Sequence, residues 1–169
     1  MLPTIPIEPL TIEAFTPFGD VIEISSAPTI MINGGMCGRF DDLAHLDFVD
    51  EGRAGISIFQ AQGYQLPLKL EMVERPPHGS QAFLPAASSP FLVIVCPDAN
   101  GSPGKPRAFL TESGQGVNYN RGIWHGVLTP LEPSCFFVVD RIGPGLNLEE
   151  HWFDTPFIIQ TNQVERSCS

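Results

Sequence analysis

Basic side chains are scarce in this sequence. Nine Lys and Arg residues stand against nineteen Asp and Glu residues, which gives a formal net charge of −10 at pH 7. Proteins that bind nucleic acid or anionic membranes usually present a basic surface, so this balance argues against both classes of partner. A small anionic substrate remains compatible with it, because a few arginines act on a ligand at short range.

Long apolar runs and closely spaced cysteines are also lacking. No segment approaches the roughly 18 apolar residues of a membrane-spanning helix. The first eight residues, Met-Leu-Pro-Thr-Ile-Pro-Ile-Glu, lack the basic and apolar regions of a secretory signal. The four cysteines, at positions 37, 96, 135 and 168, lie far apart. Their spacing indicates neither a zinc knuckle nor a disulfide framework, and we expect a cytoplasmic protein.

Turn-forming residues are plentiful, with 16 Gly and 17 Pro in 169 residues. Frequent turns between short β-type segments predict one all-β domain over residues 1–169, and a closed or sandwiched arrangement would remove the exposed edges. Thr11 is the expected N-cap of a short helix over residues 11–15. Residues 91–96 are apolar throughout, which is typical of a strand buried on both faces. The other expected strands cover residues 21–24, 54–61, 66–72, 81–85, 106–111, 117–119, 123–128 and 134–140.

One segment, residues 116–128, combines hydrophobic ends with polar side chains that suit a ligand site. A histidine in a strand, such as His125, is by itself slightly more often structural than functional. Its neighbours Tyr119 and Arg121 change this balance, because the three side chains together can accept protons, donate hydrogen bonds and bind an anion. We therefore interpret this segment as one wall of a small-molecule site.

A second segment, residues 74–83, has the same character. If residues 72–76 are extended, Glu74 and Pro76 point to one face of the strand. A turn through His78 then starts the strand that carries Gln81. The alternative is a hairpin whose end is simply solvated.

Four arginines, Arg39, Arg75, Arg121 and Arg141, lie near turns or strand ends. A guanidinium group suits a carboxylate because it donates two parallel hydrogen bonds. A single arginine is more often a surface or salt-bridge residue, but we expect at least one of the four to bind an anion.

Taken together, these segments resemble the ureidoglycolate lyase family of allantoin degradation, over nearly the whole chain. The matching motifs are Phe18-Gly-Asp-Val-Ile, Ile32-Asn-Gly, Arg39-Phe, Asp42-Leu-Ala, Glu74-Arg75, Gly79-Ser-Gln-Ala-Phe, Gly116-Val-Asn-Tyr, Arg121, Trp124-His125 and Asp140-Arg141. The resemblance implies a cupin-like double-stranded β-helix and a homodimer. It also implies a ureido C–N lyase that cleaves ureidoglycolate into glyoxylate and urea.

The chain departs from the family pattern at four positions, where Asp41, Pro76, Asn120 and Gly126 replace histidine. In a cupin-like barrel, residue 76 would face the interior together with Glu74, Gln81 and His125. Proline offers no ligand atom, and a divalent metal normally takes three or more protein ligands. We expect no cofactor and no tightly held metal, although His78 leaves room for a weakly bound divalent ion.

A mechanism follows as a hypothesis from these residues and the resemblance. His125 is the expected general base, since an imidazole titrates near neutral pH, with Glu74 as the second candidate. Arg121 or Arg39 would hold the substrate carboxylate. The remaining polar groups, Gln81, Asn118 and Tyr119, would orient the hydroxyl and ureido groups.

Two alternatives remain open at this point. One is a divergent cupin that acts on another small carboxylate-bearing compound, and the other is a non-catalytic cupin that binds one. Convergence of His125, Glu74 and an arginine in an enclosed pocket would favour an enzyme.

Overall fold

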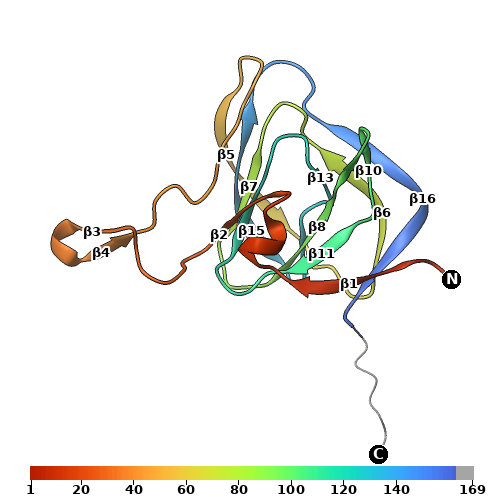
Figure 1. Ribbon diagram of the computed structural model, residues 1–169, viewed down its shortest axis with the longest axis horizontal. Helices are drawn as coiled ribbons and strands as arrows, with labels where there is room; N and C mark the ends of the chain where they lie inside the picture. Colours follow the sequence, from red (N-terminus) through yellow and green to blue (C-terminus); the bar gives the residue numbers. More distant parts are fainter. Residues whose placement is uncertain (163–169) are drawn as a thin grey trace, which may run out of the picture.

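Two β-sheets pack face to face and form almost all of the structure, a computed structural model that describes residues 1–162 (Figure 1). The predicted domain limit at residue 169 and the cysteine at position 168 lie outside the described residues. The first sheet contains seven strands in the order β11-β1-β16-β6-β13-β8-β14, and β8 also pairs with β11. This extra pairing closes six of the strands into a barrel. Their bounds are β1 Thr4–Pro9, β6 Leu68–Arg75, β8 Phe91–Cys96, β11 Arg107–Leu110, β13 Trp124–His125, β14 Thr129–Pro130 and β16 Glu149–Gln160.

The second sheet has five strands in the order β2-β12-β7-β15-β5, all antiparallel. The bounds are β2 Gly19–Ile22, β5 Arg53–Ala61, β7 Gln81–Pro85, β12 Gly116–Tyr119 and β15 Ser134–Ile142. Two small hairpins pair β3 (Ile30–Ile32) with β4 (Cys37–Arg39) and β9 (Asp98–Ala99) with β10 (Ser102–Pro103), and a 3-10 turn, Asn33–Gly35, joins β3 to β4. A closed barrel packed against a second sheet confirms the predicted all-β, cupin-like fold.

Strand β8 stands between two hydrophobic cores. Phe91, Val93 and Val95 pack toward the second sheet, whereas Leu92, Ile94 and Cys96 pack inside the closed barrel. Successive side chains of a strand point to opposite faces, so a continuous apolar run fills both cores at once. The prediction that this strand is buried on both faces is confirmed.

The short N-terminal helix α1, Ile12–Phe15, lies against the core between the sheets. The Thr11 hydroxyl accepts a hydrogen bond of 3.2 Å from the amide of Ala14, as predicted for the N-cap. The ring of Phe15 is fully buried and contacts those of Phe109 and Tyr119 at centroid distances of 6.0 and 6.1 Å.

Strand β1 was not predicted, because Pro6 and Pro9 interrupt its sequence. The structure accommodates them since each half of the strand pairs on one side only. Thr4–Pro6 pairs with β16, and Ile7–Pro9 pairs with β11. Proline lacks an amide donor and is tolerated where one edge of the strand needs no ladder hydrogen bond.

Other boundaries differ from the sequence-based expectation. Of the strand expected over 123–128, only Trp124–His125 is extended, as β13, and β14 follows at Thr129–Pro130 beyond the expected range. Strand β16 runs to Gln160, through Pro156, because a register shift between Trp152 and Phe157 accommodates the proline in a bulge. Strands β3 and β4, which the sequence did not predict, form a hairpin that stands away from the barrel (Figure 1).

No helix within residues 1–162 is long and apolar enough to cross a membrane.

Candidate active site

Three ionisable side chains lie in a row across the first sheet. Glu150 of β16 is the cross-strand partner of Glu74 in β6, and Glu74 is the partner of His125 in β13. Directly opposite residues of antiparallel strands lie on the same face of the sheet. Pairing of β6 with β13 therefore places the two predicted acid–base groups side by side.

His125 is buried between the two sheets, with 1% of its surface exposed. Its ring stacks on that of Tyr119 in β12, with a centroid distance of 4.2 Å and an interplanar angle of 3°. Nδ1 lies 2.9 Å from the carbonyl oxygen of Gly126. A carbonyl only accepts hydrogen bonds, so Nδ1 carries the proton of the neutral ring and donates it. The lone pair of the neutral imidazole is therefore on Nε2.

The Nε2 atom of His125 is buried and has no hydrogen-bond partner within the described residues. Burial lowers the pKa of His125 to about 4, against the opposing effect of the Gly126 hydrogen bond. The imidazole is neutral at physiological pH and presents an unoccupied acceptor atom. A buried polar atom without a partner costs stability, and such atoms are typical of functional sites.

Glu74 is near both rings. Burial, followed by the negative charge of Glu150, raises the pKa of Glu74. Burial, followed by the charge of Glu74, raises the pKa of Tyr119. The Tyr119 hydroxyl consequently remains protonated and is able to donate a hydrogen bond to a ligand.

Gln81 and Asp140 extend the cluster along the second sheet. Gln81 is the cross-strand partner of Tyr119, and its Nε2 lies 3.3 Å from Oδ2 of Asp140 in β15. Burial raises the pKa of Asp140, and the hydrogen bond from Gln81 partly opposes this. Sequence reasoning did not select Asp140 as a site residue. The signal was available, because Phe136 and Val138 alternate with it and point inward.

Asn118 lies on the opposite face of β12 from Tyr119. Its Nδ2 donates to Oδ2 of Asp20 and to the carbonyl of His45, each at 3.0 Å. The side chain holds the segment around residue 45 against the outer face of the second sheet. The structure does not bring Asn118 together with His125.

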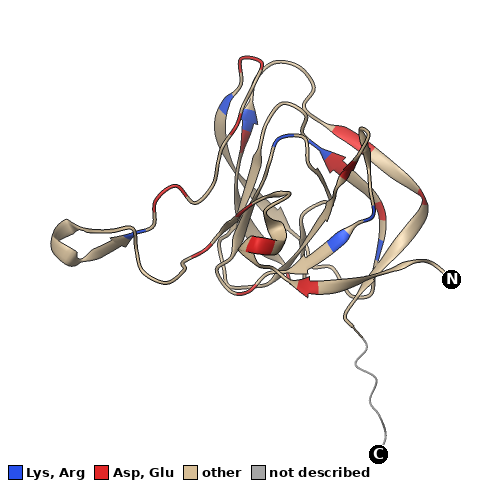
Figure 2. Cartoon of the chain, viewed as in Figure 1, with Lys and Arg blue, Asp and Glu red and all other residues tan. Residues whose placement is uncertain are grey.

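The four arginines singled out in the sequence all have partners outside the His125 cluster; Figure 2 shows how sparsely basic residues are distributed along the chain. Nε of Arg121 lies 2.7 Å from Asp47, and Nε of Arg75 lies 2.6 Å from Glu149. Arg141 is buried and donates to backbone carbonyls of residues 49, 50 and 144. Arg39 pairs with Asp41 on the β3–β4 hairpin. Within the described residues, none of these arginines forms an ion pair or hydrogen bond with Glu74, Gln81 or Asp140.

The donor set does not fit a tightly held divalent metal. Residues 1–162 contain no group of three or more His, Cys, Asp or Glu side chains placed to hold one ion. Pro76, buried just after the end of β6, offers no ligand atom, and Nδ1 of His78 is 2.6 Å from Asp50 outside the cluster. A tightly held divalent metal normally needs three protein ligands, and these side chains do not supply them.

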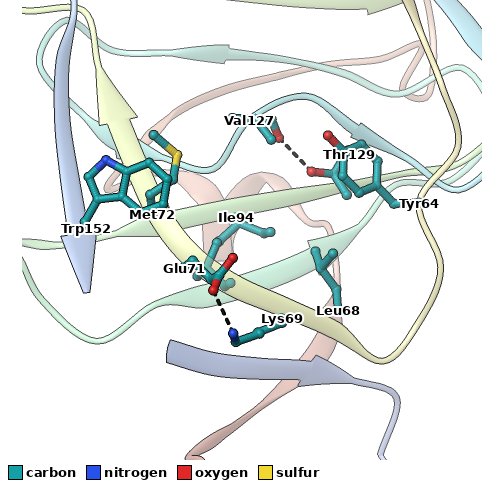
Figure 3. A pocket seen from close by; sticks show the side chains of 10 residues that line it. Tyr64, Leu68, Lys69, Glu71, Met72, Ile94, Val127, Thr129 and Trp152 are labelled. Carbon is teal, nitrogen blue, oxygen red and sulfur yellow. Dashed lines mark hydrogen bonds and ion pairs between the residues drawn. The ribbon is translucent and has the colours of Figure 1, made fainter. Parts of the chain in front are cut away.

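A separate cavity of about 170 Å³ lies beside β6 and β16 (Figure 3). Its lining is mostly apolar, with Tyr64, Met72 and Trp152 among the contributing residues. Two further lining residues, Leu70 and Ile94, belong to the core of the closed barrel. The cavity includes none of the predicted site residues and is distinct from the His125 cluster.

The fold and the cluster define the class: an all-β, cupin-like protein that holds a cluster of ionisable side chains between two sheets. A family model described as ureidoglycolate lyase matches residues 2–160. The chain belongs to the ureidoglycolate lyase family.

Individual relatives are similar over almost their entire length. The ureidoglycolate lyase of Rhodobacter capsulatus is 57% identical over 155 residues, which cover 91% of this chain and 96% of that relative. The ureidoglycolate lyase of a Chelativorans strain is 58% identical over 154 residues, or 90% and 93% of the two chains. Ureidoglycolate lyase 2 of Rhizobium meliloti is 49% identical over 162 residues, or 95% and 99%.

Proposed function

We propose that this protein is a lyase that cleaves ureidoglycolate into glyoxylate and urea. Family membership supports the reaction class. The observation that carries the proposal is the buried, neutral His125, which lies beside Tyr119 and Glu74 and whose Nε2 has no hydrogen-bond partner within residues 1–162. The neutral imidazole offers a free lone pair to a hydroxyl proton, although burial holds its pKa at about 4, below the near-neutral value expected from the sequence.

The proposed reaction moves one proton and breaks one bond. Ureidoglycolate carries a carboxylate, a hydroxyl and a ureido group on one carbon. Nε2 of His125 accepts the hydroxyl proton, the oxygen forms the carbonyl of glyoxylate, and the carbon–nitrogen bond breaks. The imidazolium then returns its proton to the departing urea nitrogen, so the enzyme ends unchanged.

Neighbouring groups assist this proton transfer. The charge of Glu74 stabilises the transient imidazolium, and the Tyr119 hydroxyl donates a hydrogen bond to a substrate oxygen. Gln81, held by Asp140, orients the ureido group through its amide. Acid–base assistance of this kind accelerates reactions by roughly 10²–10⁴-fold. The proposal requires no cofactor, consistent with a donor set that does not suit a divalent metal.

Product analysis with racemic ureidoglycolate tests the proposal. Glyoxylate and urea should form in equal amounts, faster than in the spontaneous breakdown, and a chelator should not change the rate. His125→Ala is the test variant and His45→Ala is its control. The side chain of His45 is exposed, and this residue binds Asp20 and Asn118 through its backbone amide and carbonyl. Wild-type protein that gives no acceleration over background would overturn the proposal. Acceleration by His125→Ala equal to wild type would remove His125 from the mechanism.

We further propose that the protein is a homodimer. Three apolar side chains point outward on the second sheet: Ile56 is 76% exposed, Ile58 is 66% exposed, and Phe137 is the cross-strand partner of Ile58. An apolar patch of this kind is typical of a protein–protein interface, and two-fold dimers bury one patch against its copy. Sedimentation of wild type and Ile58→Glu tests the assignment, with dissociation expected only for the variant.

The free thiols support a cytoplasmic location. Cys37, Cys96 and Cys135 are unpaired in the described part of the chain, and Cys37 is exposed. An exposed free thiol persists more readily in a reducing compartment. Fractionation of cells that express the full chain tests this location.

A further inference from the structure

The β3–β4 hairpin is an arm that the rest of its own chain does not cover. It projects from the second sheet (Figure 1), and its strands pair with each other. Ile30 and Met31 are about half exposed, and Met36 is 88% exposed. A lone two-stranded hairpin is marginally stable in water, so these apolar side chains indicate a surface that a partner covers.

The arm carries one charge. Between Ser25 and Phe40 the only ionisable group apart from the Cys37 thiol is the guanidinium of Arg39, in a chain with a net charge of −10. Figure 2 shows the basic stretch at the end of β4. Arg39 pairs with Asp41, but the Arg39 side chain is 62% exposed, and such surface ion pairs contribute little and exchange readily.

A positive charge would help the acidic cluster around His125 to bind an anionic substrate, and the arm carries one. Its substrate is proposed to be a carboxylate, yet Glu74 and Asp140 make the site negative. Arg75, Arg121 and Arg141 are engaged elsewhere. A cation would stabilise a bound carboxylate next to these acids, and within residues 1–162 none of these three arginines forms an ion pair or hydrogen bond with Glu74 or Asp140.

The arm of a chain stands away from the site of the same chain. The polypeptide returns to the body at His45, where its amide and carbonyl bind Asp20 and Asn118. Five residues lie between Arg39 and this anchor, so the six Cα–Cα steps reach up to about 20 Å when extended. The connecting stretch leads outward from the barrel (Figure 1).

We propose that each arm lies across the second copy of a two-fold dimer and places Arg39 at the partner's site, where it binds the substrate carboxylate. The apolar side chains of the arm would then be covered near the patch formed by Ile56, Ile58 and Phe137, and the acidic site would gain its cation. This inference rests on the proposed lyase activity and the proposed dimer.

Mixed dimers distinguish an arm that acts in the partner from one that acts in its own chain. Arg39→Ala and His125→Ala are each expected to abolish most activity. A heterodimer of the two has one site with both defects and one site with neither. Random pairing should therefore restore roughly a quarter of the wild-type activity. Dual affinity tags isolate the heterodimers, and His125→Gln replaces His125→Ala if the latter does not assemble.

Matched variants make the result specific to the arm. Arg53→Ala removes an exposed arginine of the body and should leave activity unchanged, whereas Arg39→Lys should retain part of it. Heterodimers that regain no activity would show that the arm acts in its own chain and would overturn the inference. A fully active Arg39→Ala variant or a monomeric wild-type protein would overturn it as well.

A second readout does not depend on catalysis. A photo-crosslinking residue replaces Met36 in dimers assembled from ¹⁴N- and ¹⁵N-labelled chains. Crosslinks of mixed isotope composition to β5, β7 or β15 support the inference, and crosslinks within one chain contradict it. Wild-type protein without lyase activity would overturn the proposed function, while this measurement would still decide where the arm lies.

Discussion

Trp124 and His125 are neighbours in β13, but their side chains enter different interiors. Trp124 packs with Val73, Ile94 and Cys96 inside the closed barrel. His125 turns to the interface between the sheets and stacks on Tyr119. The barrel core is mainly apolar, whereas the interface combines an aromatic core with a polar end. One strand thus contributes to the apolar barrel core with one face and carries the proposed base on the other.

The largest expected effect separates these two roles. His125→Ala should lower kcat by about 10²–10⁴-fold, because it removes the proposed base, and KM should change far less. Steady-state kinetics on ureidoglycolate, corrected for spontaneous breakdown, give both constants. An equal loss in kcat and in affinity would assign His125 to substrate binding rather than to proton transfer.

Substitution of the adjacent Trp124 should lower the stability of the protein and leave kcat nearly unchanged. Trp124→Ala leaves a cavity in the barrel core and removes the ring over which Arg75 lies at 4.3 Å. We expect a loss of about 3–5 kcal/mol in the free energy of unfolding. Denaturant unfolding measures this loss, and kcat per folded molecule should stay near the wild-type value. A stable variant with low kcat would show that the two faces are not separable.

Much of the fold around Trp124 and His125 could be predicted from the sequence, because the signals for these strands and for α1 are local. A continuous apolar run identified β8, the strand expected over 66–72 overlaps most of β6, and a threonine cap identified α1. Pairing of Glu74 with His125 places two predicted site residues together, although their chemical roles remain predictions. Asn118 was assigned to the site even though alternation with Tyr119 in a short strand directs it to the other face.

The other features of the fold and of the site depend on contacts between residues that are distant in the sequence. Strand β1 forms despite two prolines because its halves pair with different neighbours. The partners of Arg121 and Arg141 come from residues 47–50, which are distant in sequence. Arg39 was predicted to bind substrate, but the orientation of the hairpin separates it from the cluster of its own chain.

The free energy of unfolding at acidic pH should depend on the buried side chain of His125. His125 has a pKa of about 4 in the folded protein and about 6.5 when unfolded. The unfolded chain binds the proton first, so this contribution to stability is complete above pH 6.5 and is lost as the pH falls toward 4. The loss should be about 3 kcal/mol.

The difference between wild type and His125→Gln isolates this effect, because other groups titrate in both proteins. Denaturant unfolding near pH 7 and near pH 4 should show a smaller loss for the variant. Equal losses in the two proteins would mean that His125 titrates normally and is not held neutral by burial.

The smallest expected effect concerns the ring that His125 contacts. Tyr119→Phe keeps the stacked ring and removes the hydroxyl, whose pKa is raised so that it remains a donor. Loss of one neutral hydrogen bond to the substrate should lower kcat/KM by about fivefold, equivalent to about 1 kcal/mol. Tyr64→Phe, on the exposed loop before β6, is the matched control. A decrease of the same size in unfolding free energy, with unchanged kinetics, would place the Tyr119 hydroxyl in the structural core rather than at the substrate.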